Sequence, residues 1–311
     1  GSTYNRGLDN YDSAAATLRG GTFTGRGGSE ARGILNTNDA TLAAENVIAL
    51  GENGTDSYGL SNASVATATL RGGSYTARGG THARAIQNED NGTLLKAEMI
   101  TALGENGATS NYGLYNHSNM TVTVQNGSFI GRGGGDTYGI YNEGSSAALE
   151  IERATIQGAD GSSDNYGLYN FYGAVRLLNS SITARDGTYS RGIVNYGSGA
   201  SLTTENITAL AGGGSANNYG LDNSGGGHAT LRGGSFTGEN NVTRGIYNHG
   251  SGTVLDAERI TIVGQNGGTN HGLYNGSSAI ATADSSQLIG EEYGLYQSSG
   301  TVRLGVSQLY N

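Results

Sequence analysis

Short runs of alternating apolar and polar residues recur along the whole chain. Examples are TVTV at 121–124 and LEIE at 149–152, and similar runs are separated by Gly, Asn and Ser. Alternation with a period of two is typical of a β-strand with one buried face, whereas an amphipathic helix needs apolar residues at 3.6-residue spacing. The pattern therefore predicts an all-β protein built from short strands and turns.

The same local pattern returns about every 26 residues. The hexamer NYGLYN occurs at 111–116 and again at 165–170, and its core is a small residue, then Leu or Ile, any residue, and Asn. This core begins at Gly7, Gly33, Gly59, Ala85, Gly113, Gly139, Gly167, Gly192, Gly220, Gly245 and Gly272, with a degenerate copy at Gly294. A repeat of this length indicates a solenoid or a propeller.

The aliphatic residue after the glycine alternates between Leu and Ile, so the repeating unit is a pair of coils. With about three strands per repeat and no hairpin signal to reverse the chain, the sequence predicts a parallel β-helix in which each repeat is one coil. We expect a single domain over residues 1–311, with about twelve coils and a two-coil super-repeat. At about 4.8 Å per coil the rod would be roughly 55 to 60 Å long.

This pattern resembles the right-handed parallel β-helix, or pectin-lyase-like, repeats of bacterial surface adhesins, autotransporter passengers, phage tailspikes and polysaccharide lyases. The resemblance covers all 311 residues at the level of coil architecture. It implies a right-handed coil and an extracellular or bacterial cell-surface location. We also expect the chain to be a segment of a longer repeat protein.

Composition narrows the possible partners. The chain has 56 Gly and no Pro, which suits strands whose amides bond to neighbouring coils and turns that need positive φ. Its net charge is −9, with a single lysine, Lys96, so the basic surface that nucleic acid or an anionic membrane requires is missing. No apolar stretch is long enough to span a membrane, and no Cys is present for a disulfide or a thiolate metal site.

Stacked coils place equivalent residues in columns, and the most regular column is asparagine. Its members are Asn10, Asn36, Asn62, Asn88, Asn116, Asn142, Asn170, Asn195, Asn223, Asn248 and Asn275. Asn tolerates the left-handed backbone of a corner, and its amide can bond to the next amide in a stack. We interpret the column as a structural ladder at a corner, with no ligand.

A charged column is expected in the middle strand of each repeat. It reads Arg19, Glu45, Arg71, Glu98, Gln125, Glu152, Asn179, Glu205, Arg232, Glu258 and Asp284. Opposite charges on neighbouring strands attract and like charges repel, so the column also favours one coil register.

Two further columns carry aromatic residues. The residue before each glycine is mostly Arg or Tyr, and we place it at an outward corner. Two residues after the glycine, Tyr forms two rows, namely Tyr115, Tyr141 and Tyr169, then Tyr247, Tyr274 and Tyr296. Outward tyrosines suit sugar stacking or contact with another rod, because the ring binds apolar surface while the hydroxyl stays hydrated.

Acidic residues concentrate beside the first tyrosine row. Asp136, Asp160, Asp164 and Asp186 fall in the loops that close coils five to seven. They could line a groove with the tyrosines or hold Ca²⁺, although Asp is also an ordinary turn residue. The five His have no metal-ligand spacing, and we assign no metal site and no catalytic residue.

Two functions remain open. The first is a non-enzymatic structural or adhesive rod that binds glycans, or other copies of itself, through these columns. The second is a polysaccharide lyase or hydrolase, or a tailspike-like depolymerase, with its chemistry at the acidic loops. The regular coil length favours the first, since an active site usually interrupts a repeat with insertions.

Overall fold

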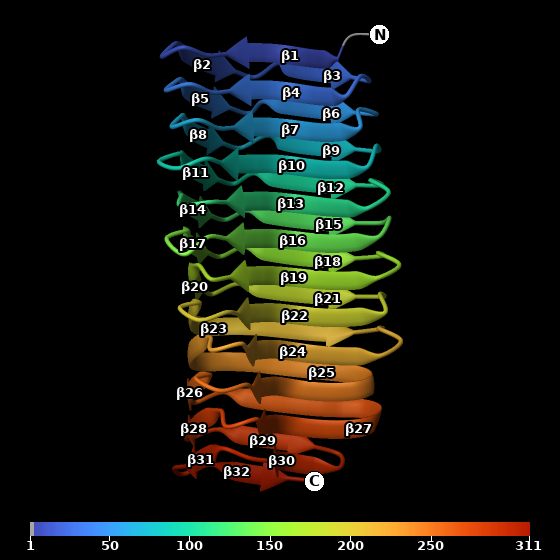
Figure 1. Cartoon of the computed structure of the whole chain (residues 1–311), viewed down its shortest axis with the longest axis vertical. Helices are drawn as coiled ribbons and strands as arrows, with labels where there is room; N and C mark the ends of the chain where they lie inside the picture. The colour runs from blue at the N-terminus through green and yellow to red at the C-terminus, as the bar shows by residue number, and fades with distance from the viewer. Residues whose placement is uncertain (1–2) are drawn as a thin grey trace.

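The computed structural model describes residues 3–311, which form a parallel β-helix (Figure 1). Every strand pairs in parallel with the strand one coil away, as in the pairing of β1 with β4 and of β4 with β7. The described residues contain about eleven full turns of three strands each, with the strands of each kind stacked into one long sheet. The predicted all-β parallel β-helix, with about 26 residues per turn, is confirmed. No helix in this part of the chain could cross a membrane.

We call the three stacks the first, second and third sheets. The first sheet contains β1 (Tyr4–Asn10), β4 (Glu30–Asn36), β7 (Asp56–Asn62), β10 (His82–Glu89), β13 (Ser110–His117), β16 (Asp136–Glu143), β19 (Asp164–Phe171), β22 (Tyr189–Tyr196), β24 (Asn217–Ser224) and β30 (Tyr293–Gln297). The second contains β2 (Ala15–Arg19), β5 (Thr41–Glu45), β8 (Thr67–Arg71), β11 (Leu94–Glu98), β14 (Thr121–Gln125), β17 (Ala148–Glu152), β20 (Ala174–Leu178), β26 (Val254–Glu258), β28 (Ile280–Asp284) and β31 (Thr301–Leu304).

The third sheet contains β3 (Thr22–Arg26), β6 (Ile48–Glu52), β9 (Ser74–Arg78), β12 (Thr101–Glu105), β15 (Ser128–Arg132), β18 (Thr155–Ala159), β21 (Ser181–Arg185), β29 (Gln287–Gly290) and β32 (Gln308–Tyr310). Three longer strands bend from one sheet to the next, namely β23 (Ser201–Gly212), β25 (His228–His249) and β27 (Thr261–Gly276).

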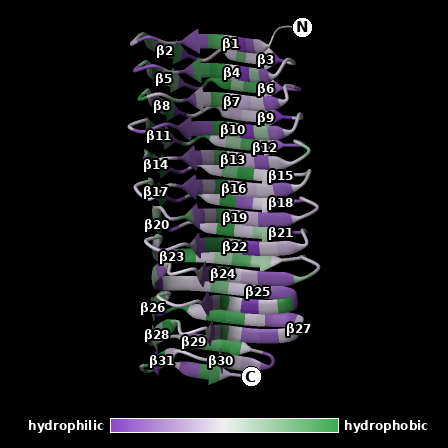
Figure 2. Cartoon of the chain, viewed as in Figure 1, coloured by the Kyte–Doolittle hydropathy of each residue, from purple (hydrophilic) through white to green (hydrophobic). Residues whose placement is uncertain are grey.

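Alternation along each strand builds the core. In β14, Val122 and Val124 point inward and are buried, while Thr121 and Gln125 face solvent. Figure 2 shows the same mixture of hydrophilic and hydrophobic positions along the strands of every coil. Because equivalent residues pair exactly, the inward side chains form continuous apolar columns along the axis.

Glycines bring the first and third sheets into backbone contact. A Cβ added to Gly113 would lie 2.5 Å from the amide nitrogen of Ile130, and one added to Gly131 would lie 2.4 Å from the carbonyl oxygen of Asn111. Neither position can hold a larger side chain without moving the backbone. The repeated glycine of the sequence motif therefore fixes the narrow cross-section of the coil.

The asparagine column forms the predicted ladder. Ten successive side-chain hydrogen bonds, each between 2.7 and 2.9 Å, run from Asn10 to Asn275. The expectation of a left-handed corner at these residues is wrong. Each Asn is the last or second-to-last residue of its strand, with its side chain inside the coil, and the left-handed residues lie in the turns, for example Asn106 (φ 59°) and Asn126 (φ 52°).

The predicted charge column is present on the second sheet, but one of its predicted members is wrong. Arg71 lies 3.8 Å from Glu98, and Arg232 lies 3.8 Å from Glu258. However, the residue in register between Glu152 and Glu205 is Leu178 rather than Asn179, which adopts a left-handed turn conformation at φ 47°. This coil has at least one residue fewer before this position than the other coils have. Counting residues from the glycine of the motif therefore selected the wrong member of the column.

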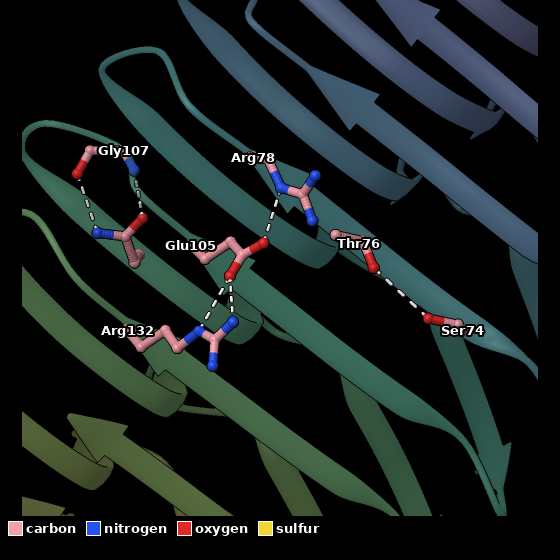
Figure 3. A network of polar contacts seen from close by, with 7 residues as sticks. Ser74, Thr76, Arg78, Glu105, Gly107 and Arg132 are labelled. Carbon is pink, nitrogen blue, oxygen red and sulfur yellow. Dashed lines mark hydrogen bonds and ion pairs between the residues drawn. The ribbon is translucent and has the colours of Figure 1, made fainter. Parts of the chain in front are cut away.

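A second charge column, which the sequence analysis missed, ends the third-sheet strands. Its members are Arg26, Glu52, Arg78, Glu105 and Arg132. Glu105 accepts a hydrogen bond from Nε of Arg78 at 2.7 Å and one from Nη2 of Arg132 at 2.6 Å, so it bridges two coils (Figure 3). This carboxylate is nearly buried, whereas its arginine partners are half-exposed.

Candidate functional site

The outward side of the first sheet carries most of the aromatic residues. In β13, Leu114 and Asn116 point inward, so Tyr112 and Tyr115 point outward on either side of Gly113. The column before the glycine therefore lies in the middle of a strand, and its predicted position at a corner is wrong. The glycine bulges inward against the third sheet, which leaves both neighbouring columns on one flat face.

Six tyrosines on three consecutive coils pack together. We call them the tyrosine block, and they are Tyr112, Tyr115, Tyr138, Tyr141, Tyr166 and Tyr169. Ring centroids are 4.8 and 5.0 Å apart along the row before the glycines, and 5.4 Å apart along the other row. Between the rows the rings meet edge to face at 5.0 to 5.3 Å. The predicted first row is thus half of a double row.

The stacking decides what the block presents to solvent. Along each row the ring planes differ by only 9° to 16°, so each ring lies against a face of the next one. Ring edges lie on the outside, whereas the hydroxyl of Tyr166 already donates to Asp164. Burial raises the pKa of Tyr115 to about 12 and also raises the pKa of Tyr138 and Tyr141, so these phenols stay neutral and can donate hydrogen bonds.

An aromatic corner, which the sequence analysis did not single out, extends the block. Phe171 follows the ladder residue Asn170 and stacks on Tyr196, with ring centroids 5.6 Å apart, while Tyr172 lies 4.2 Å from Phe171. Tyr172 and Tyr196 are exposed, and Tyr172 holds a left-handed backbone at φ 65°, which is unusual for a bulky residue. Reading the residue after each ladder Asn as a further column would have revealed this corner.

Arginines lie at both ends of the block. Arg84 lies over the ring of Tyr115, 5.2 Å from its centroid, and donates to the hydroxyl of Tyr58 at 3.0 Å. At the other end Arg191 donates to the hydroxyl of Tyr166 at 3.1 Å and pairs with Asp222 at 3.3 Å. These contacts between cation and ring hold both guanidinium groups against the face.

Asp222 is buried beneath this surface. Burial raises the pKa of its carboxyl, against the opposing effect of Arg191 and of a hydrogen bond from Ser224. The pair of Asp222 and Arg191 fills the gap between the two predicted tyrosine rows.

The four predicted acids are divided between two places. Asp136 and Asp164 begin β16 and β19 on the aromatic face, and the Tyr166 hydroxyl donates to Asp164 at 2.6 Å. Asp160 and Asp186 lie in exposed turns with left-handed φ of 58° and 67°, the role in which Asp is a common turn residue. Within residues 3–311, no three His, Cys, Asp or Glu side chains gather closely enough to hold a metal ion.

The second predicted row forms a smaller aromatic cluster. Tyr247 and Tyr274 are 5.0 Å apart, Tyr274 and Tyr296 are 5.4 Å apart, and Arg244 lies 4.5 Å from the rings of both Tyr247 and Tyr274. His271 stacks on Tyr296 at 4.6 Å. The aromatic face thus has two tyrosine patches along the axis, each in contact with an arginine, and Tyr219 lies between them, 5.9 Å from Arg191 and 5.1 Å from the ring of Tyr247.

The surface also has hollows on the second sheet. One of about 290 Å³ is lined by Thr121, Thr123, Glu150, Arg176 and Thr203, from four consecutive coils. Apolar atoms of the strands make up most of its lining, together with hydroxyls and one exposed ion pair, and no aromatic residue lines it. It is therefore separate from the tyrosine block.

Comparison with known proteins adds no family assignment. No family model and no curated protein matches the sequence. A solved hyper-glycosylated fragment of TibA, modified by TibC, aligns at 14% identity and a TM-score of 0.19, over 97% of this chain and 99% of that one. A mutant tailspike protein of an E. coli bacteriophage, in complex with a pentasaccharide, aligns at 13% identity and a TM-score of 0.25, over 97% of this chain. The alignment spans 58% of the tailspike chain.

Proposed function

We propose that this chain is a non-enzymatic binding rod of a bacterial extracellular or cell-surface protein, and that it binds glycans through the tyrosine block. The observation that carries the proposal is the double row of outward tyrosines on three consecutive coils. In other coils the position two residues after the glycine holds Leu35, Ser61 or Gln87, so the fold itself does not require tyrosine at this position. A concentration of aromatic side chains beyond structural need indicates recognition.

The chemistry of the block suits a carbohydrate. Neutral phenol hydroxyls can donate to and accept from sugar hydroxyls, and the ring edges offer apolar contact to sugar C–H groups. Arg84 and Arg191 at the two ends add donors for acidic or hydroxyl groups. At the edge of the block the side chains of Tyr172 and Tyr196 are 38% and 39% exposed. We propose that this corner supplies the stacking contact.

A polysaccharide-cleaving activity has less support. Such chemistry needs two carboxylates facing one substrate bond, or carboxylates around Ca²⁺. Of the predicted acids, Asp160 and Asp186 are exposed turn residues, and Asp164 already accepts from Tyr166. No observation on the described residues favours the enzyme over the binding rod.

A glycan array tests the proposal. The chain should bind a defined group of glycans, and the triple variant Tyr115→Ala, Tyr141→Ala, Tyr169→Ala should lose that binding while retaining the β-sheet circular dichroism spectrum. The matched control is the triple variant Tyr247→Ala, Tyr274→Ala, Tyr296→Ala on the second patch. Equal binding by the first triple variant and the unchanged protein would contradict the proposal.

A further inference from the structure

Five arginines lie on the outward side of the first sheet, each directly before the glycine of its coil. They are Arg6, Arg32, Arg84, Arg191 and Arg244. Four of them pair with a carboxylate, in the pairs Arg6–Asp9, Arg32–Glu30, Arg84–Asp56 and Arg191–Asp222. Within residues 3–311, no carboxylate pairs with Arg244. This arginine therefore differs from the other four in having no counter-charge.

The positions around Arg244 explain why it has no acidic partner. Glu30 pairs with Arg32 from two residues earlier in the same strand, and the equivalent position of β25 holds Val242. The residues in register with Val242 on the two adjoining coils are also uncharged, namely Asn217 and Thr269. The guanidinium of Arg244 thus has neutral neighbours where that of Arg32 has an acid.

Two acids near this patch are engaged with other side chains. Asp222, on the preceding strand, pairs with Arg191 at 3.3 Å. Glu292, on the following coil, lies 3.7 Å from the ring of His271. Neither of them neutralises Arg244 by direct contact.

Aromatic rings hold the Arg244 guanidinium in one place. Its central carbon lies 4.9 Å from the ring centroid of Tyr219 and 4.5 Å from the centroids of Tyr247 and Tyr274. Nη1 donates to the Tyr219 hydroxyl, and Nε is buried without a partner. Nη2 makes no hydrogen bond to another described residue, but it is open to solvent. A half-buried charge is ordinarily paired, so this donor is available for an anion from outside the chain.

The planar fork of an arginine matches a carboxylate, to which it can donate two parallel hydrogen bonds. The chain has a net charge of −9, so a densely charged polyanion would be repelled by the rest of the surface. A sugar acid instead carries one carboxylate among neutral hydroxyls. The side chains of Asn217 and Thr269 and the phenol of Tyr247 provide neutral donors and acceptors for such hydroxyls.

We infer that Arg244 binds the carboxylate of an acidic sugar, and that the rings of Tyr219, Tyr247 and Tyr274 hold the guanidinium in position for it. The site lies on the second tyrosine patch. It does not depend on glycan binding by the tyrosine block.

NMR titration of the full chain with glucuronate tests this site, and glucose is the uncharged probe. Glucuronate should shift the resonances of the Arg244 side chain and of the tyrosine rings around it, and glucose should bind at least about tenfold more weakly. Arg244→Gln should weaken glucuronate binding by a similar factor. The matched control is Arg185→Gln, which gives the same net charge. Arg185 is exposed at the end of β21, with no acid paired to it in the described part of the chain.

A second variant blocks the site while keeping the arginine. Val242→Glu places a carboxylate two residues before Arg244 on the same face of the strand, as Glu30 stands to Arg32. Arg244 then gains a partner within the chain, so glucuronate binding should fall as it does in Arg244→Gln. The circular dichroism spectrum and the melting temperature should stay close to those of the unchanged protein. This variant also has the same net charge as the control.

Several results would overturn the inference. They are no binding of glucuronate, equal binding of glucose, binding of glucose 6-sulfate alone, unchanged binding in Arg244→Gln or Val242→Glu, and an equal loss in Arg185→Gln. The triple variant Tyr115→Ala, Tyr141→Ala, Tyr169→Ala keeps every contact of Arg244 described above, so it should bind glucuronate normally. Failure of this site and failure of the tyrosine block are therefore separate results.

Discussion

The amide nitrogen of the Asn116 side chain donates to the side-chain oxygen of Asn142 at 2.7 Å, and Asn142 donates in turn to Asn170 at 2.8 Å. All three side chains are completely buried. Each link therefore satisfies a polar group that has no access to water, and it also fixes the coils in register. A slip of one residue would replace asparagine with an outward residue in this column.

Replacing Asn142 with Leu should destabilise the rod strongly. The change removes two ladder hydrogen bonds and leaves the donor of Asn116 and the acceptor of Asn170 without their ladder partners in the core. Each unsatisfied buried group costs about 1 to 3 kcal/mol, so we expect the free energy of unfolding to fall by about 2 to 5 kcal/mol. Urea unfolding measures this loss, and Asn119→Leu, which removes only an exposed hydrogen bond from the Ser146 amide, should cost about 0.5 to 1.5 kcal/mol.

The substitution Gly113→Ala should be as damaging as the loss of a ladder residue. Its new Cβ would lie 2.5 Å from the backbone nitrogen of Ile130, so the first and third sheets must separate locally. Overpacking against backbone should cost about 3 kcal/mol or more. Gly268→Ala is the control because nothing lies within 4 Å of its added Cβ and its φ is not left-handed. Equal melting temperatures for both variants would contradict the proposed cross-section.

Glu105 should contribute stability that depends on pH. Its burial would raise its pKa, but the hydrogen bonds from Arg132 and Arg78 outweigh that effect and hold the pKa of the carboxyl below 4.5. A lowered pKa means that the folded state prefers the ionised form. The stabilisation is therefore complete above the ordinary pKa of Glu and is lost as pH falls through the lowered value.

Glu105→Gln should remove this component of the acid sensitivity. We expect the free energy of unfolding of the variant at pH 7 to be about 1 to 3 kcal/mol below that of the unchanged protein, because two charge-assisted hydrogen bonds are weakened. Between pH 5 and pH 3 the free energy of unfolding should fall less for the variant than for the unchanged protein. Thermal unfolding followed at several pH values provides the measurement. Glu45→Gln in the second-sheet column is the matched control, and an identical pH profile in both variants would refute the role of Glu105.

The tyrosine block should make the rod sensitive to alkali. Burial raises the pKa of Tyr115 to about 12, compared with 10.0 for a free phenol, so the folded state retains protons that the unfolded state releases. This stabilisation is complete below pH 10 and is lost as pH rises towards 12. Ultraviolet absorbance should show a group of tyrosines that ionise late or only on unfolding. The triple variant Tyr115→Phe, Tyr141→Phe, Tyr169→Phe should resist alkali better than the unchanged protein.

Residues that repeat in every coil made the fold predictable from sequence. The Gly-aliphatic-x-Asn motif gave the coil length, and the period-two alternation gave the strands, because each coil must repeat the same backbone to pair with its neighbours. The columns of Asn116 and Tyr115 followed from that spacing alone. The motif contains no signal for handedness, which came only from the resemblance.

Features that depend on side-chain direction were less predictable. The inward bulge at Gly113 places Tyr112 and Tyr115 on the same face, although simple alternation would put residues three apart on opposite faces. Turn lengths vary by one or two residues, which misplaced Asn179 in its column. Asp160 and Asp164 are close in sequence, yet one is a turn residue and the other belongs to the aromatic face.

The alternation of Arg26, Glu52, Arg78, Glu105 and Arg132 along the third sheet limits how such a chain can change its length in evolution. Loss or gain of one coil would bring two like charges together at the junction, whereas loss or gain of two coils would keep every Glu between arginines. Gene duplication and deletion are therefore tolerated best in two-coil units, each of which changes the reach of the rod by about 10 Å.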